Sequence, residues 1–178
     1  MSILPGITCL LQYLNYIKFI LAECKPKFCS HCGNLKVWGW GFYYREAYRR
    51  GGSFSMLDPI PIQRFYCPSC HRTTSILPEC MSPRRWYLWQ QQQEVILLCL
   101  AGASLSKVSR QAGPSRSTAR RWLVWVQDQF RYHKDAICSH WSGLGLANNY
   151  ADFWQNCFQK TSLARGMYLC GVAGVSVP

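Results

Sequence analysis

The sequence has few acidic residues. Its 178 residues include 8 Asp and Glu against 20 Lys and Arg, which gives a formal net charge of +12. The eight acids are scattered, so the chain offers little for the clustered carboxylates of a two-metal nuclease or transferase. The positive charge instead favours a polyanion as partner. With 49% hydrophobic residues, the composition is typical of a folded protein and excludes a globally disordered one.

The N-terminal stretch lacks the features of a targeting or membrane-spanning segment. It has no basic residue before Lys18, unlike a secretory signal peptide. Asn15 and Lys18 also interrupt what would otherwise be an apolar span. We interpret Leu10–Leu21 as a buried or partner-facing helix, with membrane association as the alternative. The expected compartment is a reducing cytoplasm, in which paired cysteines usually bind metal.

Cysteine, in contrast, is abundant, and four of the eleven form two matched pairs. The pairs are Cys29-Ser-His-Cys32, followed by Gly33, and Cys67-Pro-Ser-Cys70. Two residues between thiolates allow a tight turn to direct both sulfurs at one ion, and glycine suits the positive φ that such a turn needs. Together the pairs predict one closed tetrahedral site for structural Zn(II). Two disulfide or redox pairs are the alternative. Inert thiols are expected at Cys9, Cys24, Cys99, Cys138, Cys157 and Cys170.

The segment between the pairs is rich in aromatic residues and predicts short antiparallel strands. We expect strands over residues 36–44, 61–66 and 73–76, with a turn at Gly51-Gly52. This layout is that of a small zinc ribbon. The aromatic side chains of the first strand are expected to pack around the metal, with a contact surface for RNA or protein as the alternative; they are Trp38, Trp40, Phe42, Tyr43 and Tyr44. Phosphate contacts are expected from Lys36, Arg45, Arg49, Arg50 and Arg64.

A helical region follows the second cysteine pair. Ser82-Pro83 is a favourable helix start, and the apolar spacing continues to Gly102. A second helix is expected from Ser104 to Gly113, and a third after Pro114-Ser115. Two short helices joined by a turn with glycine, after a longer supporting helix, describe a helix-turn-helix.

The third helix has a polar, basic face in a stretch without acids between Glu94 and Asp128. Its N-terminal half would enter the major groove, where Arg makes bidentate bonds to guanine. A solvated basic face is the alternative. The expected DNA contacts are Ser115, Arg116, Ser117, Thr118, Arg120 and Arg121, with Lys107 and Arg110 from the preceding helix.

The run from Val108 to Leu123 resembles the helix-turn-helix of bacterial insertion-sequence transposases and their regulators. The upstream part is similar to the zinc-binding N-terminal module of the same group. The matching residues there are Cys29, Cys32, Gly33, Gly41, Tyr43, Arg45, Arg64, Phe65, Cys67, Cys70, Leu77, Pro78 and Pro83. The resemblance implies a bacterial, nucleoid-associated protein of a mobile element that binds double-stranded DNA.

The chain departs from a full transposase after Val126, where about 50 residues with three acids follow. A catalytic domain with three separated acids and two metal ions does not fit there. We therefore expect no enzyme activity, and a regulator or end-binding subunit that acts with a separate catalytic chain or as a homodimer. A truncated or defective transposase is one alternative, and a zinc-ribbon module for RNA or protein is another.

The sequence thus predicts an α+β chain in four parts. These are an apolar N-terminal helix in residues 1–27, a zinc ribbon in 28–81, a three-helix helix-turn-helix module in 82–132, and a weakly specified C-terminal tail in 133–178.

Overall fold

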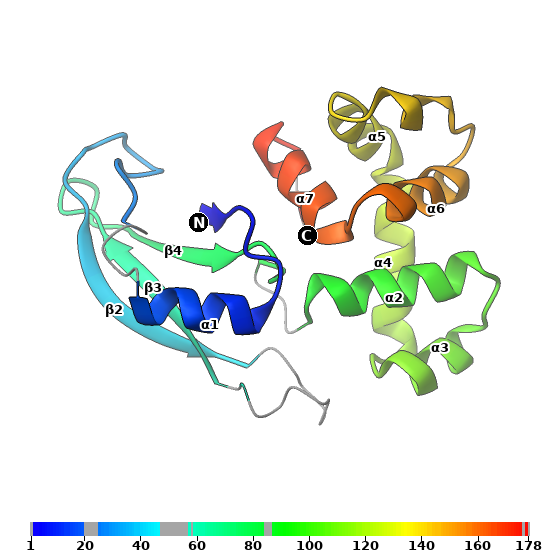
Figure 1. Ribbon diagram of the computed structural model, residues 1–178, viewed down its shortest axis with the longest axis horizontal. Coiled ribbons are helices and arrows are strands. Elements are labelled where there is room, and N and C mark those ends of the chain that lie inside the picture. The colour runs from blue at the N-terminus through cyan, green and yellow to red at the C-terminus, as the bar shows by residue number, and fades with distance from the viewer. Residues whose placement is uncertain are drawn as a thin grey trace. The chain divides into compact units, whose positions relative to one another are not determined.

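The structure, a computed structural model, describes residues 2–19, 25–46, 57, 59–83, 87–175 and 177 (Figure 1). Within these residues the chain is α+β, as predicted, with one four-stranded sheet and seven α-helices. It divides into two compact units, Met1–Trp86 (unit 1) and Tyr87–Pro178 (unit 2). None of the described helices is long and apolar enough to cross a membrane.

Unit 1 is built on a sheet with the strand order β1-β4-β3-β2. The strands are β1 (Ser2–Leu4), β2 (Trp38–Arg45), β3 (Ile60–Tyr66) and β4 (Thr73–Pro78). β2, β3 and β4 form an antiparallel meander over the three predicted segments, whereas β1 pairs in parallel with β4. Strand β1 has no signal in the sequence, because three residues are too few to show an alternating pattern.

Helix α1 (Leu10–Phe19) lies against this sheet (Figure 1). Leu10, Tyr13 and Ile17 are spaced three and four residues apart and are all buried, so they form one apolar face of the helix. The Tyr13 hydroxyl donates a hydrogen bond of 3.0 Å to the Pro61 carbonyl on β3. The N-terminal helix is thus a packed element of unit 1, and its predicted end at Leu21 lies outside the described residues.

The two faces of the sheet carry different side chains near the cysteine pairs. Phe65 is buried in a small cluster with Val37, Ile76, Cys29 and Cys67. Successive strand residues point to opposite faces, so the neighbours of these apolar residues, Trp38 and Tyr66, lie on the other face, where they pair across β2 and β3. A bulge in β2 between Gly39 and Phe42 contains Gly41 at φ +70°.

Unit 2 contains the other six helices. They are α2 (Trp89–Leu100), α3 (Leu105–Ala112), α4 (Arg116–Asp128), α5 (Phe130–Cys138), α6 (Tyr150–Lys160) and α7 (Leu163–Val172). α2, α3 and α4 enclose a small core of Val95, Val108, Ala112, Ala119 and Trp122. The predicted boundaries of α3 and the predicted start of α4 are confirmed. Ser104 and Ser115 cap their N-termini, and Gly113 ends α3 at φ +87°.

The expectation of a weakly specified tail in residues 133–178 is wrong. α5, α6, α7 and a 3-10 turn (Ser142–Leu146) pack with one face of α2 around the larger core of the unit. Ile137, Phe153, Trp154, Leu163 and Cys170 are all fully buried there. Helices α6 and α7 begin with side-chain caps at Asn149 and Ser162. Asn149 and Ser162 are residue types that favour the N-cap position, so the sequence itself contains these two signals.

The predicted helix start at Ser82 is also wrong. Ser82 is fully buried in unit 1 and its carbonyl accepts a hydrogen bond of 2.8 Å from the Arg45 guanidinium. Helix α2 starts at Trp89, without a side-chain cap. A Ser-Pro pair is a local signal for a helix start, and here tertiary contacts override it.

Candidate metal centre and basic helix face

The two cysteine pairs lie in turns of the same design. In the first turn, the Cys29 amide donates to the Asn34 carbonyl at 2.8 Å. In the second, the Cys67 amide donates to the Arg72 carbonyl at 2.9 Å, again five residues along the chain. Each turn therefore closes on its own backbone and presents two sulfurs on one side. The first precedes β2, and the second connects β3 to β4.

These turns bring the four sulfurs together, as the sequence predicted. The Sγ atoms of Cys29 and Cys70 are 3.7 Å apart and those of Cys32 and Cys67 are 3.6 Å apart. All four ligand atoms lie within 4.8 Å of one another. A tetrahedral ion with metal–sulfur bonds of about 2.3 Å would place neighbouring sulfurs about 3.8 Å apart. The cluster can therefore hold one metal ion.

The same distances exclude the disulfide alternative in this structure. A disulfide bond joins its sulfurs at about 2 Å, and all four cysteines here are free thiols. Close sulfur pairs also join one turn to the other, since Cys29 is close to Cys70 and Cys32 to Cys67. This arrangement is typical of four ligands around one centre.

Backbone N–H groups lower the pKa of two of the four thiols and so favour their thiolate forms. Main-chain N–H groups of Cys70 and Ser69 lower the pKa of Cys67 to about 6. The N–H of His31, 3.4 Å from the Cys29 sulfur, lowers the pKa of Cys29. Burial, in contrast, raises the pKa of Cys70 to about 12. Four thiols this close ionise together when a cation compensates their charge.

Other thiols and histidines do not join the cluster in the described part of the chain. Cys80 is buried, and burial raises its pKa to about 12. Cys157 and Cys170 lie in the core of unit 2, and burial raises the pKa of each to about 12. Cys157 and Cys170 are two of the thiols expected to be inert, whereas Cys9 is exposed and Cys24 lies outside the described residues.

The predicted DNA-contacting residues gather at the start of α4 and on α3. Arg116, Arg120 and Arg121 are exposed on α4, while the opposite face of that helix buries Ala119 and Trp122. Arg116 and Arg120 have no hydrogen-bond or ion-pair partner among the described residues, and Arg121 reaches the Thr118 hydroxyl at 3.4 Å. Lys107, Arg110 and Ser117 are exposed as well.

The Ser115 hydroxyl organises the first turn of α4. It accepts a hydrogen bond of 3.3 Å from the Thr118 amide, and it lies 3.0 Å from the Ser117 hydroxyl and 2.9 Å from the Thr118 hydroxyl. A helix N-terminus with free N–H groups and nearby Arg side chains favours a bound phosphate.

The basic residues predicted on unit 1 differ in how accessible they are. Lys36 is exposed. Arg45 is half-buried and donates a hydrogen bond to the Ser82 carbonyl, and its burial lowers its pKa. Arg64 is half-buried with its guanidinium 6.0 Å from the centre of the Tyr43 ring. Arg49 and Arg50 lie outside the described residues.

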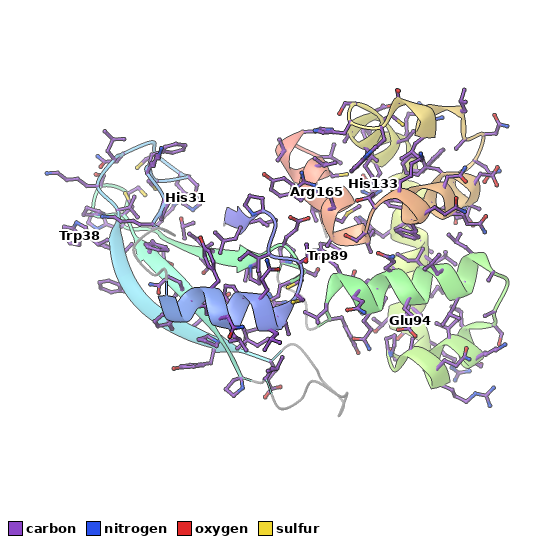
Figure 2. All side chains as sticks on the ribbon, in the orientation of Figure 1. His31, Trp38, Trp89, Glu94, His133 and Arg165 are labelled. Carbon is purple, nitrogen blue, oxygen red and sulfur yellow. The ribbon has the colours of Figure 1, made fainter. Side chains whose placement is uncertain are left out.

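The expectation that the aromatic residues of β2 pack around the metal is wrong for three of the five. Trp38, Trp40 and Tyr44 are exposed at 54%, 50% and 68%. Trp38 lies at the same end of unit 1 as His31 of the first turn (Figure 2). The strand pattern contained a signal for this arrangement, because Trp38 and Trp40 alternate with Val37 and Gly39 and so share one face.

Comparison with known proteins gives one family. Residues 29–122 match the model of a family described as a domain of unknown function (DUF6431). The match starts at Cys29 and ends at Trp122, so it includes both cysteine turns and the basic face of α4. No match was found among curated proteins or among solved structures. Since the matched segment is more than half of the chain, the protein belongs to the DUF6431 family.

Proposed function

We propose that this chain is a sequence-specific, double-stranded DNA-binding protein and that α4 is the helix that reads the major groove. The observation that carries the proposal is the pair of exposed, unpartnered guanidinium groups of Arg116 and Arg120 in the first half of α4. No acid occurs from residue 95 to residue 127, so nothing in this segment competes with phosphate for them.

The arrangement of α2, α3 and α4 supports a helix-turn-helix. α3 and α4 are short, and a left-handed Gly113 followed by the Ser115 cap joins them. α2 supports both through the core that contains Val95, Val108 and Trp122. In such a motif the N-terminal residues of the second helix contact base edges. Arg116 and Ser117 would then lie nearest the bases, and Arg121 and Lys107 nearer the phosphates.

The metal of unit 1 is, in this proposal, a structural Zn(II) ion in a zinc ribbon. Four thiolates saturate a tetrahedral ion and leave no position for an activated water. Cys29, Cys32, Cys67 and Cys70 would hold the ion, and its role would be to fix the two turns to each other. Lys36 and Arg72, both exposed beside these turns, are then available for phosphate.

The protein would act without catalysis of its own, in a bacterial cytoplasm, on the DNA of a mobile element. This part of the proposal rests on the resemblance to transposase N-terminal regions and on the scattered positions of the eight acids. A separate catalytic chain would supply any strand cleavage or joining.

The test is a selection for bound sequences from a library of randomised duplexes, followed by affinity measurements. Arg116→Ala and Arg120→Ala should each weaken binding to the selected duplex by roughly 5- to 150-fold, with a much smaller loss on random duplex. Arg131→Ala is the matched control, because Arg131 is an exposed arginine on α5. Equal losses on both duplexes, or equal effects of Arg120→Ala and Arg131→Ala, would contradict sequence recognition by α4.

A further inference from the structure

Unit 1 has an exposed aromatic surface that neither the metal nor the core accounts for. It consists of Trp38, Trp40, Tyr66 and His71, from β2, β3 and the second cysteine turn. The Trp40 and Tyr66 rings are stacked, with their centres 4.9 Å apart and their planes at 30°. The Trp38 ring lies 6.3 Å from that of Tyr66. Half of each tryptophan remains open to solvent.

A hydrogen bond between side chains holds part of this surface in place. The Tyr66 hydroxyl and Nδ1 of His71 are 2.7 Å apart. His71 adopts φ +56° and is the one non-glycine residue at positive φ in the described part of the chain. The second cysteine turn holds His71 in this conformation, as the first turn holds Gly33. In this conformation the His71 ring lies beside that of Tyr66, with the ring centres 6.3 Å apart.

The charge around the aromatic surface favours an anionic partner. Lys36 lies two residues before Trp38, and Arg72 follows His71; both are exposed. The described acids of unit 1 are Glu46 and Glu79, and Glu79 is buried. Exposed ring faces with nearby cations are the features by which proteins bind single-stranded nucleic acid, since the bases stack on the rings and the cations meet the phosphates. Paired bases inside a duplex have no free face for this.

We propose that the aromatic surface is a second nucleic-acid site, which stacks on unpaired bases of single-stranded DNA. The site is separate from α4, and it relies on the proposed function only for the choice of DNA as the polymer. Trp40 and Trp38 supply the ring faces on which bases stack, and Tyr66 packs against the Trp40 ring. Lys36 and Arg72 contact the phosphates.

The test measures binding of the full chain, with its metal, to a fluorescent 15-nucleotide oligothymidine and to a duplex. Trp40→Ala should weaken oligothymidine binding by roughly 5- to 150-fold, the value of one stacked base, and should leave duplex binding unchanged. Trp40→Phe keeps a ring and should recover most of the affinity. Tyr44→Ala is the control, because Tyr44 is also an exposed aromatic residue of β2 but has no ring contact in the described structure.

The two proposals fail separately in this design. Arg120→Ala should reduce duplex binding and leave oligothymidine binding intact, the reverse of Trp40→Ala. Equal effects of Trp40→Ala and Tyr44→Ala, or oligothymidine binding that Trp40→Ala does not change, would overturn the stacking site while leaving the role of α4 in place. An unchanged metal content and melting temperature of each variant show that any loss is not a loss of fold, and Trp38→Ala provides a second variant should Trp40→Ala misfold.

Discussion

Gly33 and His71 occupy equivalent positions in the two cysteine turns. Each lies four residues after the first cysteine of its pair, and each has positive φ, +72° for Gly33 and +56° for His71. The turn therefore requires the left-handed conformation whichever residue is present. Glycine adopts it freely in the first turn, and in the second His71 is held there beside Tyr66.

Replacing the glycine tests this requirement. A Cβ at Gly33 would meet no atom within 4 Å, so the cost of Gly33→Ala is conformational, about 1–2 kcal/mol. The midpoint of the denaturant transition that releases the metal should fall accordingly. Gly39→Ala is the control, since Gly39 is free of steric contacts too but is not at positive φ. Equal behaviour of the two variants would show that the backbone of the turn is not the cause.

Metal content is expected to follow the four cysteines. The purified chain should carry about one zinc ion, and Cys29→Ser combined with Cys67→Ser should abolish it, because two of four ligands are then lost. Elemental analysis by mass spectrometry measures the ratio. Cys99→Ser serves as control, since Cys99 belongs to unit 2 and is not one of the four clustered cysteines. Zinc retained by the double variant would mean that the ligands are different residues.

His133 should make unit 2 sensitive to acid. It is fully buried between Trp125 and Trp154, and neither ring nitrogen has a hydrogen-bond partner in the described structure. Burial lowers its pKa from 6.5 to about 4. The unfolded chain therefore takes up a proton before the folded chain does, and stability falls as the pH drops from about 6.5 towards 4.

The expected loss at His133 is about 2 kcal/mol of unfolding free energy between pH 7.5 and pH 5. His133→Phe, which keeps an aromatic ring among the tryptophans, should remove this component and should not destabilise the unit at pH 7.5, because it also removes two unpaired buried nitrogens. Chemical denaturation of the parent chain and of His133→Phe at pH 7.5 and pH 5 measures the unfolding free energies that test this. A variant with the pH dependence of the parent chain would rule out His133 as its source.

The C-terminal helices should contribute strongly to stability. Ile137 is fully buried in the larger core of unit 2, and α7 approaches it so closely that a Cβ at Gly166 would lie 3.2 Å from its Cδ1 atom. Ile137→Ala should cost about 2–5 kcal/mol. Leu146→Ala, at a leucine that is 86% exposed, should change the unfolding free energy by less than about 0.5 kcal/mol. Similar small effects at both positions would indicate a loosely packed tail.

The features that the sequence predicted correctly depend on short stretches of chain. A Cys-x-x-Cys turn and the caps at Ser104 and Ser115 are each fixed within about five residues, so their spacing alone is informative. That Cys29 and Cys67 meet follows from a chemical requirement for four ligands, not from any local pattern.

The features that the sequence predicted wrongly depend on contacts between residues far apart in the chain. Ser82 has the local pattern of a helix cap, but its carbonyl bonds to Arg45, 37 residues away. The buried residues of α5, α6 and α7 become a core only when they meet Trp89 and Ile96 of α2. Trp38 and Trp40 look like core residues by composition, yet the bulge and strand pairing leave them on an open face.

The parallel pairing of β1 with β4 means that unit 1 cannot complete its sheet until β4 has been synthesised. Ser2 pairs with Ile76, and Leu4 with Pro78, so the first strand leaves the ribosome long before its partner exists. The Gly6 amide donates a hydrogen bond of 2.8 Å to the Glu79 carboxylate, so this bond also forms only after Glu79 has been synthesised. Until then the apolar face of α1 has no complete sheet to cover, and contacts between residues so far apart in sequence form slowly. A nascent chain arrested before residue 67 would therefore expose that face to chaperones, because it contains the first cysteine turn but neither the second turn nor β4.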